Sequence, residues 1–107
     1  MRFLCLAYGD GKDWNALSRK EQEELLAADE VIRRRGALMA AVEPQATVVR
    51  VWDGRPDVTH ESFAAASVPL AGFSVIEAED LDEVVRLVAN TPFARARGAI
   101  EVRRIAE

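Results

Sequence analysis

Cysteine and histidine are scarce in this sequence of 107 residues, which has one of each, Cys5 and His60. A single cysteine excludes a disulfide within the chain. A structural zinc site needs clustered Cys and His ligands, which this pair cannot supply, so we expect no metal. The glycines do not form a phosphate loop either, because Gly9-Asp10-Gly11 lacks the remainder of that motif and its Lys-Ser/Thr. The sequence therefore predicts neither a nucleotide site nor any other cofactor.

Concentrated positive charge is also missing, and the formal net charge is −4. Nucleic acids and anionic membranes both attract clustered positive charge, so neither is an expected partner. Arg33, Arg34 and Arg35 form a run, but it falls at the expected end of a helix, where it stabilises the helix dipole. No apolar run is long enough to span a membrane. Residues 3–7 are too short a run for a signal peptide, so we expect a cytoplasmic protein.

Apolar runs and turn signals divide the chain into six expected strands and two expected helices. The strands are expected at 3–8, 37–42, 46–52, 57–60, 72–77 and 99–105. Ser18 and Glu21 have capping-box spacing and predict the start of the first helix, which Gly36 should end at positive φ. Asp80 and Glu83 predict the start of the second helix in the same way. Residues 12–17 and 93–98 should be connections, and 64–71 a loop or a short helical turn.

The order of these elements predicts an α+β fold in one domain. Two β-α-β units joined by a hairpin, with Asp53-Gly54 as its turn, give a ferredoxin-like sandwich. Both helices would cover the same face of the sheet and leave the other face bare. A second copy packed sheet against sheet is the economical cover, so we expect a homodimer.

Short motifs along nearly the whole chain resemble those of the YCII-related family, in particular its branch with an Asp-Gly-Pro-Phe signature. The motifs that carry the resemblance are Tyr8-Gly9-Asp10, Gly36-Ala37-Leu38, Val49-Arg50-Val51, Asp53-Gly54, Leu70-Ala71-Gly72-Phe73, Asp80-Leu81-Asp82-Glu83 and Ile100-Glu101-Val102-Arg103. The resemblance implies a dimeric α+β barrel of two ferredoxin-like protomers. It also implies a cleft in each protomer between sheet, helix and hairpin loop.

The chain departs from that family at the positions that matter for chemistry. Where the branch has Asp-Gly-Pro-Phe, this chain has His60-Glu61-Ser62-Phe63. The Glu and Lys that usually follow are replaced by Ala65 and Ser67. The wider family has a His on its first helix, paired with an Asp, and Leu25 occupies about that place. Either the site is rebuilt around His60 or it has been lost.

Three residues are candidates for catalysis. His60 is the side chain that titrates near neutral pH. Ser62 would share its face if the segment is extended, because alternate residues point the same way. Asp29 lies beside the apolar stripe of the first helix, where it would be a rim residue, the favoured reading, or a pocket carboxylate.

Four residues are candidates for ligand binding: Tyr8, Asp10, Trp14 and Phe63. The first three lie at the end of the first strand and in its loop, where binding groups concentrate. We expect His60 to lie in or beside a pocket formed with Tyr8 and Trp14. Two functions remain open: a cofactor-independent enzyme for elimination, isomerisation or cyclisation of a small organic molecule, and a non-catalytic dimer that binds a ligand or a protein.

Overall fold

A four-stranded antiparallel sheet forms the body of the chain in the computed structural model, which describes residues 1–64 and 66–107. Its strands are β1 (Arg2–Tyr8), β2 (Leu38–Ala41), β5 (Leu70–Glu77) and β6 (Ala99–Arg104). They lie in the order β2-β5-β1-β6, with each neighbouring pair antiparallel. The expected α+β fold is therefore confirmed. Ala65, one of the altered signature positions, lies outside the described residues.

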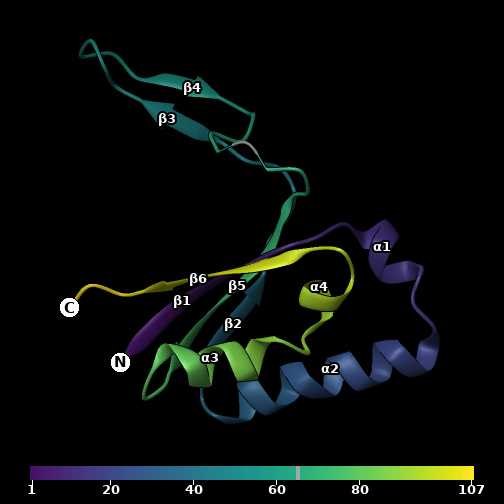
Figure 1. Cartoon of the computed structure of the whole chain (residues 1–107). Coiled ribbons are helices and arrows are strands. Elements are labelled where there is room, and N and C mark those ends of the chain that lie inside the picture. The colour runs from purple at the N-terminus through teal and green to yellow at the C-terminus, as the bar shows by residue number, and fades with distance from the viewer. Residues whose placement is uncertain (65) are drawn as a thin grey trace.

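The helices all lie on one side of this sheet (Figure 1). The long helix α2 (Arg19–Arg34) begins at the predicted capping box, in which Glu21 N donates to Ser18 Oγ at 3.1 Å and Ser18 N donates to Glu21 Oε1 at 3.2 Å. Gly36 follows the helix with φ of +83°, as predicted. Helix α3 (Leu81–Val88) begins at Asp80, whose carboxylate accepts a hydrogen bond from the backbone N–H of Glu83.

Two short helices replace expected connections. Helix α1 (Gly11–Asn15) forms within the predicted loop because the Asp10 carboxylate accepts a hydrogen bond from Lys12 N at 3.0 Å and so caps it. Helix α4 (Pro92–Arg95) forms because Pro92 at its first position already has a helical φ and needs no donor there. The expectation of plain loops at 12–17 and 93–98 was therefore wrong.

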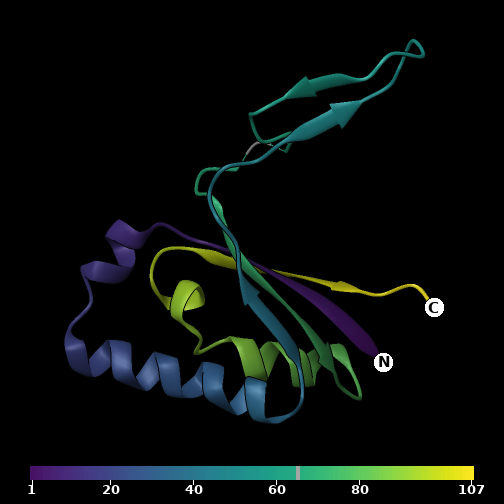
Figure 2. The same ribbon diagram turned by 180° about the vertical axis from the view of Figure 1, so that it is seen from behind.

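The core lies between the sheet and the two longer helices. The side chains of Ile32 on α2, Val84 on α3 and Ile76 on β5 are almost fully buried, as are Phe3 and Cys5 on β1. Because side chains alternate along a strand, Leu4 and Leu6 point to the opposite face. That face carries no helix in either view (Figures 1 and 2).

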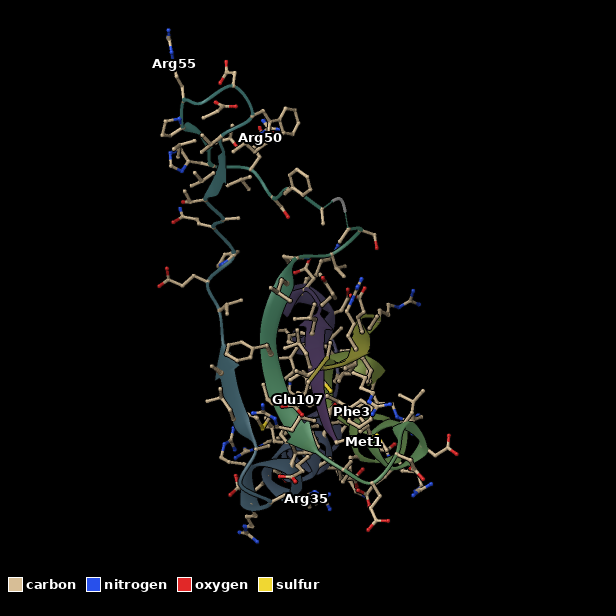
Figure 3. All side chains as sticks on the ribbon, turned by 90° about the vertical axis from the view of Figure 1, so that its left-hand side faces the viewer. Met1, Phe3, Arg35, Arg50, Arg55 and Glu107 are labelled. Atoms are coloured by element: carbon tan, nitrogen blue, oxygen red, sulfur yellow. The ribbon has the colours of Figure 1, made fainter. Side chains whose placement is uncertain are left out.

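A two-stranded hairpin projects away from this body, and we call its segment, residues 43–64, the arm (Figure 2). Its strands are β3 (Val48–Arg50) and β4 (Asp57–Thr59), and Gly54 between them has φ of +86°. Both strands are shorter than expected. Pro56 precedes β4 and falls opposite Val51 in the register, so it has no N–H to extend β3 beyond Arg50. Figure 3 shows Arg50 and Arg55 on the arm, far from Met1 and Phe3 in the body.

The arm gives the chain an elongated shape. Its Cα radius of gyration is 15.6 Å, whereas a compact chain of this length has about 13 Å. Neither β3 nor β4 makes a substantial contact with any other helix or strand. Within residues 1–64 and 66–107, no helix combines the length and apolar character needed to cross a membrane.

Candidate functional site

A cavity of about 450 Å³ lies between the helix-covered face of the sheet and the helices α1, α2 and α4. Its floor is made mostly by small side chains of the sheet, and its walls include two aromatic rings. The floor residues are Cys5, Ala7, Ala41, Gly72, Ser74 and Ile100. This lining is mainly apolar, and its volume lies in the range of small-molecule pockets.

Asp29 places a carboxylate in this apolar wall. It lies on α2, is partly buried and lines the cavity, which is compatible with either of the two expected positions, at the rim or in the pocket. Burial raises the pKa of the Asp29 carboxyl, and the positive charge of Arg33, one turn further along, opposes that rise. Arg33 lines the same cavity. The site therefore combines a partly desolvated carboxyl group with a nearby guanidinium, which also pairs with Glu30 at 2.7 Å.

Trp14 forms one aromatic wall of the cavity. It lies on α1 and is partly buried at the cavity. Its carbonyl oxygen accepts a hydrogen bond from Gln22 Nε2 at 2.9 Å, which ties α1 to α2. Asp10 is exposed and caps α1 instead of lining the cavity. Asp10 thus positions the helix that carries Trp14.

Phe93 on α4 forms the other aromatic wall, and nothing in the sequence analysis pointed to it. Its ring lies directly over Gly9: a Cβ at Gly9 would be 1.9 Å from Phe93 Cδ1. Gly98 permits a second close approach, because a Cβ there would be 2.0 Å from the carbonyl oxygen of Tyr8. The two glycines let the α4 segment close against the end of β1. The Thr91-Pro92 start signal for α4 could have indicated this wall.

His60, Ser62 and Phe63 lie on the arm and are exposed, with 72% of Phe63 accessible. His60 Nδ1 lies 3.4 Å from Thr47 Oγ1, and the Ser62 hydroxyl donates to the Ala64 carbonyl at 3.1 Å. Neither side chain is therefore the hydrogen-bond partner of the other. Burial of His60 in a pocket with other site residues is not seen.

Tyr8 is partly buried at the end of β1 and does not line the cavity. Among the expected pocket residues, the structure brings together Trp14 and Asp29. The expectation that His60 shares a pocket with Tyr8 and Trp14 was wrong for a single chain, because the arm carries His60 away from the sheet (Figure 1).

The strands that lead into and out of the arm line this cavity. Ala40 and Ala41 on β2 and Ala71 and Gly72 on β5 belong to the lining. Just beyond them, the N–H of Val42 donates to the carbonyl of Ala71 at 2.9 Å. This hydrogen bond joins the segments that lead into and out of the arm at the edge of the cavity.

Comparison with known proteins gives a family and a similarity to solved structures. The family model described as the YCII-related domain matches residues 1–107. No curated protein matches the chain. The chain is similar to the structure of 5-chloro-2-hydroxyhydroquinone dehydrochlorinase (TftG) from Burkholderia phenoliruptrix AC1100 in complex with 2,5-dihydroxybenzoquinone. The two are 19% identical with a TM-score of 0.50, and the match covers 99% of this chain and 94% of the other. At this identity the similarity concerns the fold.

Proposed function

We propose that this chain, which belongs to the YCII-related domain family, forms a homodimer that binds a small planar organic molecule and catalyses proton transfer on it without a cofactor. The observation that carries the proposal is the partly buried carboxyl group of Asp29 in the wall of a mainly apolar cavity. Elimination or isomerisation of an aromatic or quinone-like compound is the reaction class that such a group would serve.

The shape and lining of the cavity support a planar ligand. Its volume of about 450 Å³ accommodates a single substituted ring. Trp14 and Phe93 offer aromatic surfaces, which favour stacked or edge-on contacts with another ring. The structurally similar dehydrochlorinase was solved with 2,5-dihydroxybenzoquinone, a molecule of this class. We carry that ligand class over to this chain as part of the proposal.

Asp29 would exchange protons with the ligand. Arg33 would bind a negatively charged group of the ligand. A carboxyl group whose pKa is raised by burial holds its proton more firmly, so it transfers protons better near neutral pH than an exposed Asp does. The guanidinium of Arg33 would favour a ligand with a phenolate or carboxylate oxygen.

The homodimer is supported by the bare face of the sheet. In the strand register, Leu4 lies opposite Val75 and Leu6 lies opposite Phe73, so these four side chains share the face without helices. Leu38 extends this face on β2 and is 61% exposed. A second copy packed there would remove these side chains from water. Five other residues remain predicted site residues, and a partner would be needed to bring them into a site: His60, Ser62, Tyr8, Asp10 and Phe63.

Ligand binding can be tested with Trp14 as the reporter. The variant Trp52→Phe leaves Trp14 as the sole tryptophan. Titration with 2,5-dihydroxybenzoquinone, corrected for its absorption, should then quench Trp14 fluorescence saturably. Arg33→Gln should weaken binding about tenfold, because a charged hydrogen bond is lost. Quenching that only follows concentration linearly would refute binding of this class.

Catalysis can be tested by hydrogen exchange on the same compound. In D₂O, its ring C–H positions exchange when a ring carbon is protonated and then deprotonated, and NMR follows the loss of the signal. The protein should accelerate the exchange, and Asp29→Asn should remove about a hundredfold or more of that acceleration. The control Glu24→Gln removes an exposed carboxylate from the same helix and should change nothing. Saturable binding without accelerated exchange would instead favour a non-catalytic binding protein.

A further inference from the structure

The two faces of the arm differ in how well the chain itself covers them. Val49 lies opposite Val58, and Thr47 and His60 lie on the same side one step nearer the body. We call these four residues the valine face. Val49 is 60% exposed and Val58 is 51% exposed. An exposed apolar pair at the centre of an isolated hairpin is a feature of interaction sites.

The opposite face of the arm is partly covered by its own side chains. Arg50 places its guanidinium carbon 4.9 Å from the centre of the Trp52 ring, and its Nη2 lies 3.3 Å from the Asp57 carboxylate. Val48 and Thr59 on that face are partly buried. Trp52 on that face is itself 82% exposed, so the arm carries uncovered apolar surface on both sides, and the valine face is the side whose apolar pair lies at the centre of the ladder.

The arm as a whole lacks support from its own body. A two-stranded hairpin is marginally stable in water unless it packs against something, and each strand here has three residues. The arm lies away from the sheet in both views, so this chain cannot fold its valine face onto its own sheet as arranged here (Figures 1 and 2).

The exposed area of the chain gives the scale of what must be covered. The accessible surface is 7816 Å², whereas a compact chain of 11.8 kDa exposes about 5,900 Å². The excess of about 1,900 Å² exceeds the roughly 800 Å² that each partner buries in a standard interface and falls in the range of obligate dimers. The sheet face and the arm together would account for this excess of exposed surface.

We propose that the valine face of the arm docks against a second copy of this chain, so that each protomer embraces the other. This inference rests on the homodimer of the proposed function and adds the contact that the arm makes. A second copy is favoured over a different protein because the sheet face and the valine face are both uncovered apolar surfaces of one chain. A twofold interface covers both at once on both copies.

The docking contact is tested by two neighbouring substitutions on β4 that point to opposite faces. Val58→Glu puts a charge on the valine face, and Thr59→Glu puts the same charge on the other face. In sedimentation equilibrium, Val58→Glu should raise the dimer Kd at least about tenfold, whereas Thr59→Glu should change it less than about threefold. Circular dichroism of each variant checks that the sheet is retained. Equal effects of the two variants would overturn the proposal.

The variant Leu6→Glu separates this proposal from the dimer itself, because Leu6 lies on the sheet face. A dimer that Leu6→Glu dissociates and Val58→Glu leaves intact would refute arm docking and keep the sheet-to-sheet dimer, leaving the valine face to a different protein. A wild-type chain that is monomeric at every concentration would refute both.

A second measurement does not depend on weakening the interface. Arg55→Cys at the tip of the arm takes a paramagnetic tag, while Cys5 is buried and its thiol pKa is raised by burial, so it resists labelling. The chain that carries the paramagnetic tag has no ¹⁵N label and is mixed with ¹⁵N-labelled wild type. Broadening of amide signals in the labelled chain is expected if the arm reaches the partner, and unbroadened spectra of a proven dimer would overturn the proposal.

Discussion

Gly9 leaves room for the Phe93 ring that forms one wall of the cavity, and Gly9→Ala tests this contact directly. The added Cβ would lie 1.9, 2.4 and 2.6 Å from three atoms of the Phe93 ring. Ordinary van der Waals contact begins near 3.4 Å, so the ring would be about 1.5 Å too close and would have to move. The backbone itself accepts alanine, because φ at Gly9 is not in the positive region.

The expected cost follows from overpacking a closed contact. Such changes destabilise a fold by about 1 to 3 kcal/mol. Because Phe93 lines the cavity, its displacement should also weaken binding of 2,5-dihydroxybenzoquinone, by about tenfold if roughly 1.4 kcal/mol is lost. Urea denaturation measures the first effect, and the Trp14 titration measures the second.

Two further variants make the reasoning refutable. Gly11→Ala adds the same methyl group at a helical position with nothing within 4 Å, so it should be neutral or stabilise by up to about 1 kcal/mol. In a Phe93→Ala background, which removes the ring, Gly9→Ala should cost much less than in the wild type. A Gly9→Ala variant as stable as Gly11→Ala, or one whose cost persists without the ring, would show that this contact does not shape the cavity.

Three other outcomes follow from single residues. Asp29→Asn should be more stable than the wild type at pH 7, because the neutral amide avoids the cost of a partly buried charge. The folded-state pKa of Asp29 is raised above its ordinary 3.8, so the ionised form costs stability above that raised value, and the advantage of Asn should vanish in urea titrations as the pH falls toward 3.8. Ser18→Ala should cost about 1 kcal/mol through loss of the α2 cap, and unchanged urea midpoints would contradict this. Cys5 should react with a thiol reagent at the rate of unfolding, and fast labelling of the native protein would contradict its burial.

Local signals in the sequence placed the main helices well. Ser18 and Glu21 satisfy each other's backbone donors, and Asp80 caps α3, so both starts are encoded within a few residues. The short helix α4 was missed because a Pro at its first position also serves as a helix stop for the element before it.

The site was harder to predict because it depends on what faces each residue. Asp29 has the same position on a helical wheel whether it faces water or the floor of the cavity. Which of the two it faces depends on how α2 packs over the sheet. His60 was expected at the cavity because the family resemblance implies a cleft between sheet, helix and hairpin loop. No local rule states the direction in which a hairpin leaves a sheet, and here the arm points away (Figure 2).

The hydrogen bond from Val42 to Ala71 has a thermodynamic meaning, because the backbone that it joins is both cavity wall and base of the arm. If the arm contacts a second copy of the chain, any change that stiffens this junction affects both ligand binding and dimer formation. We then expect reciprocity: a small molecule that tightens subunit association by some factor must itself be held more tightly by the pair than by the separated chain, by that same factor.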